Sequence, residues 1–257
     1  MQGVKVVIIF YIIMQSISSF SQNPEFYEIR CYQLSNNDQV KAMDSYLKTA
    51  LLPAIHSMGI NRVGVFKEVG IDTASEKRMF VLVPSSSVSG LPSMAYDAYV
   101  DQENRKKGDA FWMAPHDSPP YDRLDITIIK SFEYMSRMHV PSFETDDMEQ
   151  IFELRSYEGA TERLYRQKVK MFNQGGEMDI FADLDFNSVF YGEVLVGSQM
   201  PNLMYMTSFK DMSDRDQHWD AFREAPAWAD LKVQEEYANT VSKIHIYLLH
   251  PTGYSDL

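Results

Sequence analysis

An internal repeat limits the folds open to this chain more than any other property of its sequence. The segment Phe26-Tyr-Glu-Ile-Arg-Cys-Tyr32 returns 125 residues later as Ile151-Phe-Glu-Leu-Arg-Ser-Tyr157. Both copies alternate apolar and polar residues, which is typical of a β-strand with one buried face. A motif that recurs at this distance within 257 residues indicates two related structural units in place of one large domain.

Each copy of the repeat is followed by the same order of expected elements. Apolar residues at three- and four-residue spacing predict helices over residues 38–57 and 161–171. Two extended runs joined by a turn follow each helix, and then come a second helix and a last extended run. The second helices contain Tyr96-Asp-Ala-Tyr99 and Trp219-Asp-Ala-Phe222. The extended runs are 62–69, 78–83, 124–132, 187–196, 203–209 and 240–249.

The order β-α-β-β-α-β, present twice, predicts the α+β fold class. It is the order of the ferredoxin-like unit, whose sheet has helices on one face and an open second face. Because an open sheet face must be covered, we expect two tandem ferredoxin-like domains packed sheet to sheet as an intramolecular dimeric α/β barrel. The expected domains are residues 23–137 and 149–251. A linker over 138–148, which mixes Pro, Ser and acidic residues without an apolar period, joins them.

Several motifs of the second copy resemble the NIPSNAP family. Phe152-Glu-Leu-Arg-Ser-Tyr157, the run 203–209, Asp214-Arg215 and Ala225-Pro-Ala-Trp228 stand in the order typical of that family. The first copy departs from the pattern, since Pro84-Ser-Ser-Ser stands where the second copy has Phe209-Lys-Asp-Met. The resemblance implies a ferredoxin-like, dimeric α/β barrel. It implies no particular reaction, because the family has no agreed activity.

The first 21 residues are typical of a secretory signal peptide. Lys5 supplies a basic start, residues 6–14 are apolar, and Ser19 and Ser21 are the small residues expected before a cut at Gln22. Nine apolar residues are too few for a permanent membrane span. We therefore expect export, with the mature chain periplasmic or secreted after cleavage near Ser21; a buried N-terminal strand or an uncleaved anchor is the alternative.

The two repeated strands carry the candidate ligand-binding residues. Side chains alternate between the faces of a strand, so each copy presents a Glu, an Arg and a Tyr on one face. The opposite faces are more apolar, and we expect them to pack against the helices. The polar sets would then meet between the sheets, either as a ligand pocket or as a network that fixes the sheet register without a ligand. The six residues are Glu28, Arg30, Tyr32, Glu153, Arg155 and Tyr157.

A catalytic interpretation adds one histidine to this set. His245 lies on the more polar face of the last extended run, together with Tyr247. We expect His245 near Arg155 and Tyr157, with Arg155 as an oxyanion clamp and the other two as acid–base partners. A structural hydrogen bond made by His245 is the alternative.

Charge, cysteine content and missing motifs exclude several classes of function. With 24 basic and 36 acidic residues and a net charge of −12, the chain has no excess of cations for binding nucleic acid. The one cysteine, Cys31, excludes a disulfide framework, and we expect it to be a buried, unreactive thiol on the helix-facing side of the first strand. No zinc, dinucleotide or nucleoside triphosphate motif occurs, so no metal and no cofactor are expected.

Three functions remain open at this point. The first is a small-molecule-binding or interaction module. The second is a cofactor-independent dimeric-barrel enzyme, of the monooxygenase or isomerase type, acting on a small aromatic or polyketide-like substrate. The third is a structural envelope protein without a ligand. Residues 111–121 and 174–185, which break the repeat, are candidates for a lid or a partner loop, and a homo-oligomer also stays open.

Overall fold

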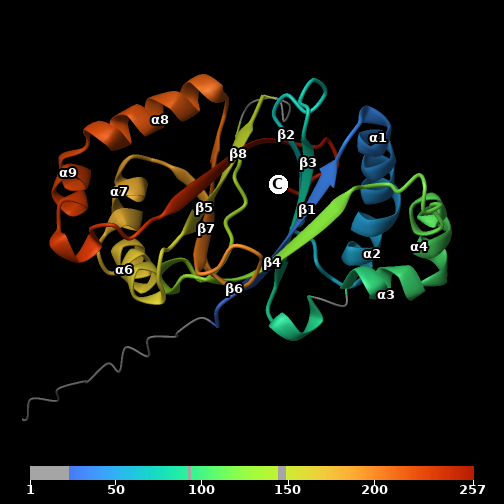
Figure 1. Ribbon diagram of the computed structural model, residues 1–257, viewed down its shortest axis with the longest axis horizontal. Coiled ribbons are helices and arrows are strands. Elements are labelled where there is room, and N and C mark those ends of the chain that lie inside the picture. Colours follow the sequence, from blue (N-terminus) through green and yellow to red (C-terminus); the bar gives the residue numbers. More distant parts are fainter. Residues whose placement is uncertain (1–22, 92–93, 144–148) are drawn as a thin grey trace, which may run out of the picture.

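A closed β-barrel forms the centre of the molecule (Figure 1). The computed structural model describes residues 23–91, 94–143 and 149–257. Within these residues, eight antiparallel strands close in the order β1-β3-β2-β8-β5-β7-β6-β4. The strands are β1 (Phe26–Leu34), β2 (Gly64–Glu68), β3 (Lys77–Ser85), β4 (Arg123–Ser131), β5 (Ile151–Glu158), β6 (Asn187–Val196), β7 (Asn202–Phe209) and β8 (Lys243–Pro251).

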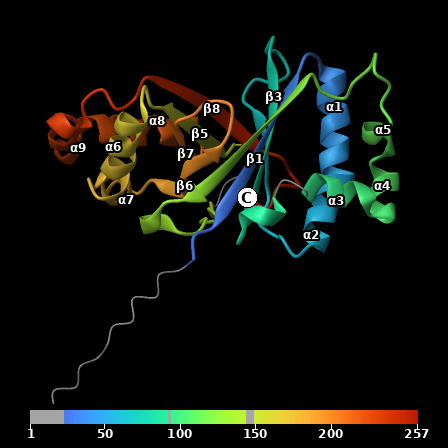
Figure 2. The same cartoon turned by 60° about the horizontal axis from the view of Figure 1, so that its bottom comes forward.

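Helices cover the barrel on two opposite sides, as the two views together show (Figure 1, Figure 2). On one side lie α1 (Asn37–Tyr46), the π-helical turn η1 (Leu47–Leu51), α2 (Leu52–Ser57), α3 (Met94–Val100), α4 (Gln102–Lys107) and α5 (Asp109–Trp112). On the other side lie α6 (Glu162–Asn173), α7 (Glu177–Asp183), α8 (Met212–Glu224) and α9 (Pro226–Lys232). In the described part of the chain, no helix combines the length and the apolar character that a membrane crossing requires.

The barrel closes where the two halves of the chain meet. The first half contributes the neighbouring strands β4-β1-β3-β2 and the second half contributes β8-β5-β7-β6. Two antiparallel seams join them: β2 pairs with β8, where Phe66 lies opposite Pro251, and β4 pairs with β6, where Ser131 lies opposite Gly192. The expected α/β barrel is therefore confirmed as a closed, eight-stranded antiparallel barrel, and hydrogen-bonded seams hold its two halves together.

Side-chain caps begin three of the longer helices. Asn36 accepts a hydrogen bond from the backbone N–H of Gln39 at the start of α1, and Asp211 does the same for Asp214 at the start of α8. Thr161 caps α6. Each cap satisfies one of the backbone donors that a helix leaves free in its first turn.

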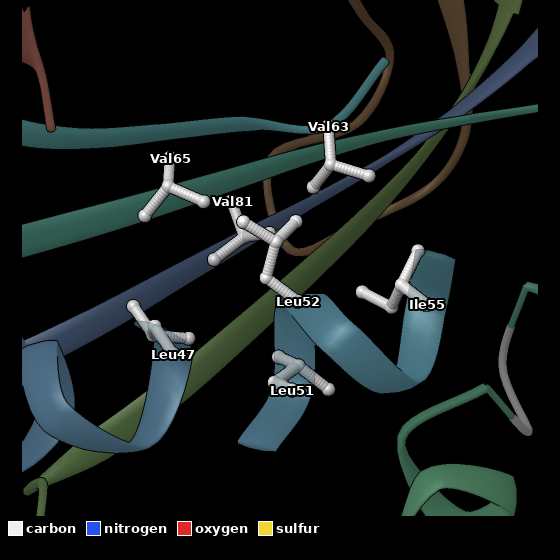
Figure 3. A pocket seen from close by; sticks show the side chains of 7 residues that line it. All are labelled: Leu47, Leu51, Leu52, Ile55, Val63, Val65 and Val81. Atoms are coloured by element: carbon white, nitrogen blue, oxygen red, sulfur yellow. The ribbon is translucent and has the colours of Figure 1, made fainter. Parts of the chain in front are cut away.

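Three apolar clusters hold the layers together, one under each group of helices and one inside the barrel. Figure 3 shows part of the first, in which the leucines and isoleucine of η1 and α2 meet Val65 and Val81 of the sheet and Val63 just before β2, and leave no water-sized void. The residues drawn are Leu47, Leu51, Leu52, Ile55, Val63, Val65 and Val81.

The cluster inside the barrel is built by both halves of the chain. The rings of Phe66 and Phe152 lie 4.9 Å apart, and so do those of Tyr27 and Phe190. Each of these pairs joins a strand of one half to a strand of the other. The two halves thus share one buried core, which couples their stabilities.

The two segments that break the repeat are packed into the helical layers. In residues 111–121, the ring of Phe111 stacks on Tyr46 of α1 at 3.7 Å. In residues 174–185 the chain forms α7, and the buried ion pair between Lys168 Nζ and Glu177 Oε2, 2.6 Å apart, joins α7 to α6. The expected signal peptide and residues 144–148 of the expected linker lie outside the described residues.

Candidate functional site

A cavity of about 260 Å³ opens inside one end of the barrel. It lies where β1 and β5 end and where β3, β4, β7 and β8 begin, and the turn between β6 and β7 also lines it. The barrel interior is otherwise filled by side chains. The lining residues are Ile29, Cys31, Gln33, Arg78, Phe80, Asp125, Thr127, Ser156, Val194, Gly197, Ser198, Gln199, Asn202, Met204, His245 and Tyr247.

Three side-chain hydrogen bonds organise the polar wall of this cavity. The amide of Gln33 donates to Asp125 Oδ2 over 2.7 Å, and the amide of Asn202 donates to Ser156 Oγ over 2.7 Å. His245 Nε2 lies 2.6 Å from Glu158 Oε1 at the rim. Strand register explains these positions, because His245 lies opposite Ser156 in the β5–β8 ladder and both therefore point into the barrel.

The inner wall of the cavity is apolar and aromatic. Ile29, Val194 and Met204 line it and belong to the apolar cluster inside the barrel. The rings of Phe80 and Tyr247 lie 5.1 Å apart and are tilted by 52° to one another. A cavity with an apolar floor and a few convergent polar groups is the usual form of a small-molecule site.

Burial keeps two ionisable groups of the cavity in their neutral forms. It raises the pKa of the Cys31 thiol to about 12, a shift that the nearby Arg78 partly opposes. Burial also raises the pKa of the Tyr247 phenol. Cys31 points into the barrel, where it lies opposite Phe80 and Asp125, so its expected place on the helix-facing side is wrong. Its raised pKa fits an unreactive thiol.

The face assigned to the Glu, Arg and Tyr of each repeat is also wrong. The alternate residues, such as Tyr27 and Phe152, fill the barrel, whereas Tyr32 and Tyr157 belong to the clusters under the helices. The expectation failed because it treated the helical layer as the more apolar environment. The helices supply buried polar partners, and the barrel interior is the more apolar layer. The six residues on the helix side are Glu28, Arg30, Tyr32, Glu153, Arg155 and Tyr157.

In the second half, a compact network surrounds one buried carboxylate, that of Glu153. This side chain is fully buried and accepts hydrogen bonds from Arg155 Nε at 2.5 Å, Arg215 Nε at 2.7 Å and Trp219 Nε1 at 2.8 Å. Arg155 also donates to the Tyr157 hydroxyl over 3.2 Å. The barrel wall therefore separates Arg155 and Tyr157 from His245, and the structure does not bring the three together at one cavity.

The equivalent network of the first half has fewer partners. Arg30 Nε donates to Glu28 Oε1, but the second oxygen, Glu28 Oε2, is buried without a hydrogen-bond partner in the described residues. Burial raises the pKa of the Glu28 carboxyl, although Arg30 opposes that shift. Glu28 and Arg30 lie away from the cavity, and this pair fits the interpretation of a structural network.

Sequence reasoning missed most of the residues that form the cavity. Four of them lie near the ends of strands, where the alternation of apolar and polar residues covers few positions: Gln33, Arg78, Asp125 and Asn202. One signal was available for Asp125, because Asp125 and Thr127 are inward-facing polar residues in an otherwise apolar run. Across residues 23–91, 94–143 and 149–257, no group of three or more His, Cys, Asp or Glu side chains could hold a metal ion.

Comparisons with known proteins support one family for part of the chain. Residues 152–256 match the model of the NIPSNAP family. This match covers β5 through β8 and the helices α6–α9, which include the network around Glu153. No curated protein matches the sequence significantly.

Three solved structures resemble most of the chain at low sequence identity. A protein of Fusobacterium nucleatum provisionally named a monooxygenase gives a TM-score of 0.56 at 8% identity, covering 89% of this chain and 92% of its own. A provisionally named monooxygenase of Lactobacillus acidophilus gives 0.52 at 10%, covering 89% and 94%. An anthrone oxidase-like protein gives 0.52 at 9%, covering 90% and 93%. The comparisons therefore show an α/β-barrel fold over 89–90% of the chain and support the NIPSNAP family for its C-terminal part, residues 152–256.

Proposed function

We propose that this chain is an exported small-molecule-binding protein whose site is the cavity at the end of the barrel. The observation that carries the proposal is the convergence of polar side chains from both halves of the chain on one cavity with an apolar floor. Gln33, Asp125 and Thr127 come from the first half, and Ser156, Asn202 and His245 come from the second. Such a site needs both halves, which gives a reason for joining them in one chain.

We also propose that the two halves of the chain are related domains and that the chain is exported. The two halves, residues 23–137 and 149–251, are taken as tandem NIPSNAP-like, ferredoxin-like domains. The element order β-α-β-β-α-β in each half and the family match of the second half support this. Export is proposed from the basic, apolar and small-residue pattern of residues 1–21.

Mass spectrometry of small molecules that co-purify with the mature protein tests the binding function. The matched variants are Thr127→Trp, which fills the cavity, and Ile126→Trp, which alters the next residue of β4 on the outer face, where Ile126 is 37% exposed. We expect Thr127→Trp to lose a ligand that the wild type and Ile126→Trp both retain. If the folded Thr127→Trp variant retains every co-purifying molecule, the cavity is not the binding site.

A second candidate function is acid–base catalysis without a cofactor. The observation that favours it is the contact of His245 Nε2 with Glu158 Oε1 beside the cavity, because a carboxylate that holds an imidazole orients it for proton transfer. The fold neighbours named as monooxygenases and as anthrone oxidase-like make a small aromatic substrate the first choice for assays. If the protein is an enzyme, His245→Gln should abolish turnover and retain ligand binding; a pure binder has no turnover to lose.

A further inference from the structure

We propose that the cavity selects a small molecule with a protonated amine and rejects carboxylates and enolates. This inference rests on the proposed binding function and names the chemical class of the ligand. It assigns Asp125 as the counter-ion of the ammonium group, the ring of Phe80 as its aromatic surface, and Asn202 as an additional acceptor.

The charges around the cavity favour a cation. Arg78 is the guanidinium of the lining, but it is already engaged by carboxylates, with Arg78 Nη1 lying 3.2 Å from Glu68 Oε2 and a second ion pair to Glu76. Asp125 keeps a free carboxylate oxygen, because its one hydrogen bond within the described residues is that from Gln33 to Oδ2. An anionic ligand would meet this carboxylate with no uncommitted guanidinium to offset the repulsion.

Hydrogen-bonding capacity points the same way. Asn202 is only 3% exposed, its amide nitrogen donates to Ser156, and its Oδ1 is buried without a partner in the described residues. Asp125 Oδ1 is a second acceptor, to which no donor of the described residues hydrogen-bonds. An ammonium group has three donors and no acceptor, so it complements a wall with surplus acceptors, whereas a carboxylate has only acceptors.

The aromatic wall supplies a third attraction. A cation is attracted to the face of an aromatic ring, and because the Arg78 guanidinium already lies 5.8 Å from the centroid of the Tyr247 ring, the Phe80 ring is the surface left for the ammonium group. Because burial raises the pKa of Tyr247, the ring carries a neutral phenol that does not ionise near neutral pH. Ile29, Val194 and Met204 can take the hydrocarbon body of the ligand, and the volume of about 260 Å³ restricts it to a size below that of most drugs.

The test uses three probes with one hydrocarbon body: phenethylamine, 2-phenylethanol and phenylacetate. Their affinities are measured by ligand-observed NMR on the mature wild type, on Asp125→Asn and on Asp122→Asn, which removes an exposed carboxylate near the same end of the barrel. We expect phenethylamine to bind tightest to the wild type. Its Kd should rise by about tenfold in Asp125→Asn and by less than about twofold in Asp122→Asn, while the Kd of 2-phenylethanol changes little.

The outcomes separate this inference from the proposed function. Tighter binding of phenylacetate or 2-phenylethanol, or an unchanged Kd of phenethylamine in a folded Asp125→Asn variant, overturns the ligand class. Wild-type selectivity alone decides the question if Asp125→Asn fails to fold. Absence of binding by all three probes overturns the class as well. The binding function itself is tested by Thr127→Trp: loss of the co-purifying ligand supports it, and retention of the ligand overturns it.

Discussion

The guanidinium carbon of Arg155 lies 3.6 Å from the centroid of the Trp219 ring, between the barrel wall and α8. At this distance the cation is stacked on the ring, and both groups also donate hydrogen bonds to the buried carboxylate of Glu153. The contact joins β5 to the helix that covers it. Arg155 therefore lies between β5 and α8 and does not line the cavity.

Glu153→Gln should destabilise the fold without altering the cavity. The substitution leaves Arg155 and Arg215 without their shared carboxylate, and breaking a buried ion pair typically costs about 3–5 kcal/mol. Urea unfolding followed by circular dichroism measures the loss. The matched control is Asp216→Asn, which removes the exposed partner of Arg215 and should cost less than about 1 kcal/mol. Equal losses in the two variants would contradict the structural importance of the buried network.

Glu28 should make stability depend on pH in the direction opposite to that of an ordinary paired carboxylate. Its pKa in the folded state is raised by burial, so folding favours the protonated form. The stability it contributes is complete below its unfolded-state pKa and is lost as the pH rises through its folded-state pKa. The free energy of unfolding of Glu28→Gln, minus that of the wild type, should therefore increase from about pH 4 to about pH 8. Parallel pH profiles for the two proteins would show that Glu28 has no raised pKa.

The order of elements was predictable from the sequence because it depends on local patterns and on the repeat. The expected run 187–196 coincides with β6, and the expected helix over 38–57 appears as α1, η1 and α2. These assignments depend on residues a few positions apart, whose periodicity is visible in the sequence.

The faces of the strands were not predictable in the same way. Whether Glu153 points toward helices or into the barrel depends on Arg215 and Trp219, which lie more than 60 residues further along the chain. The cavity depends on residues that are still further apart in the sequence, since Asp125 and Asn202 line one cavity only after both seams have closed the barrel. Sequence periodicity identifies alternation along a strand, but it does not identify what lies opposite each face.

Cys31 should react slowly with alkylating reagents although it lines a cavity. Its pKa of about 12, compared with 9.0 for an unperturbed thiol, leaves about a thousandfold less thiolate at neutral pH. Intact-mass measurements during iodoacetamide treatment should show labelling of the native protein about a hundredfold or more slower than that of the urea-unfolded chain. Cys31→Ser should take no label and serves as the control. Rapid labelling of the native chain would mean that the thiol is ionised and reactive.

Gly192→Ala should weaken the seam between β4 and β6, and with it the closed barrel. A Cβ atom at Gly192 would lie 2.5 Å from the carbonyl oxygen of Lys130 and would collide with Ile129, so the backbone of the seam must move. Overpacking of this kind typically costs about 1–3 kcal/mol, measurable by urea unfolding. Gly253→Ala is the matched control, because nothing lies within 4 Å of the position a Cβ would take there. Since the two halves share the core inside the barrel, Gly192→Ala should lower the stability of both halves in one transition. Separate transitions for the two halves would show that they fold independently and that the seam contributes little to either.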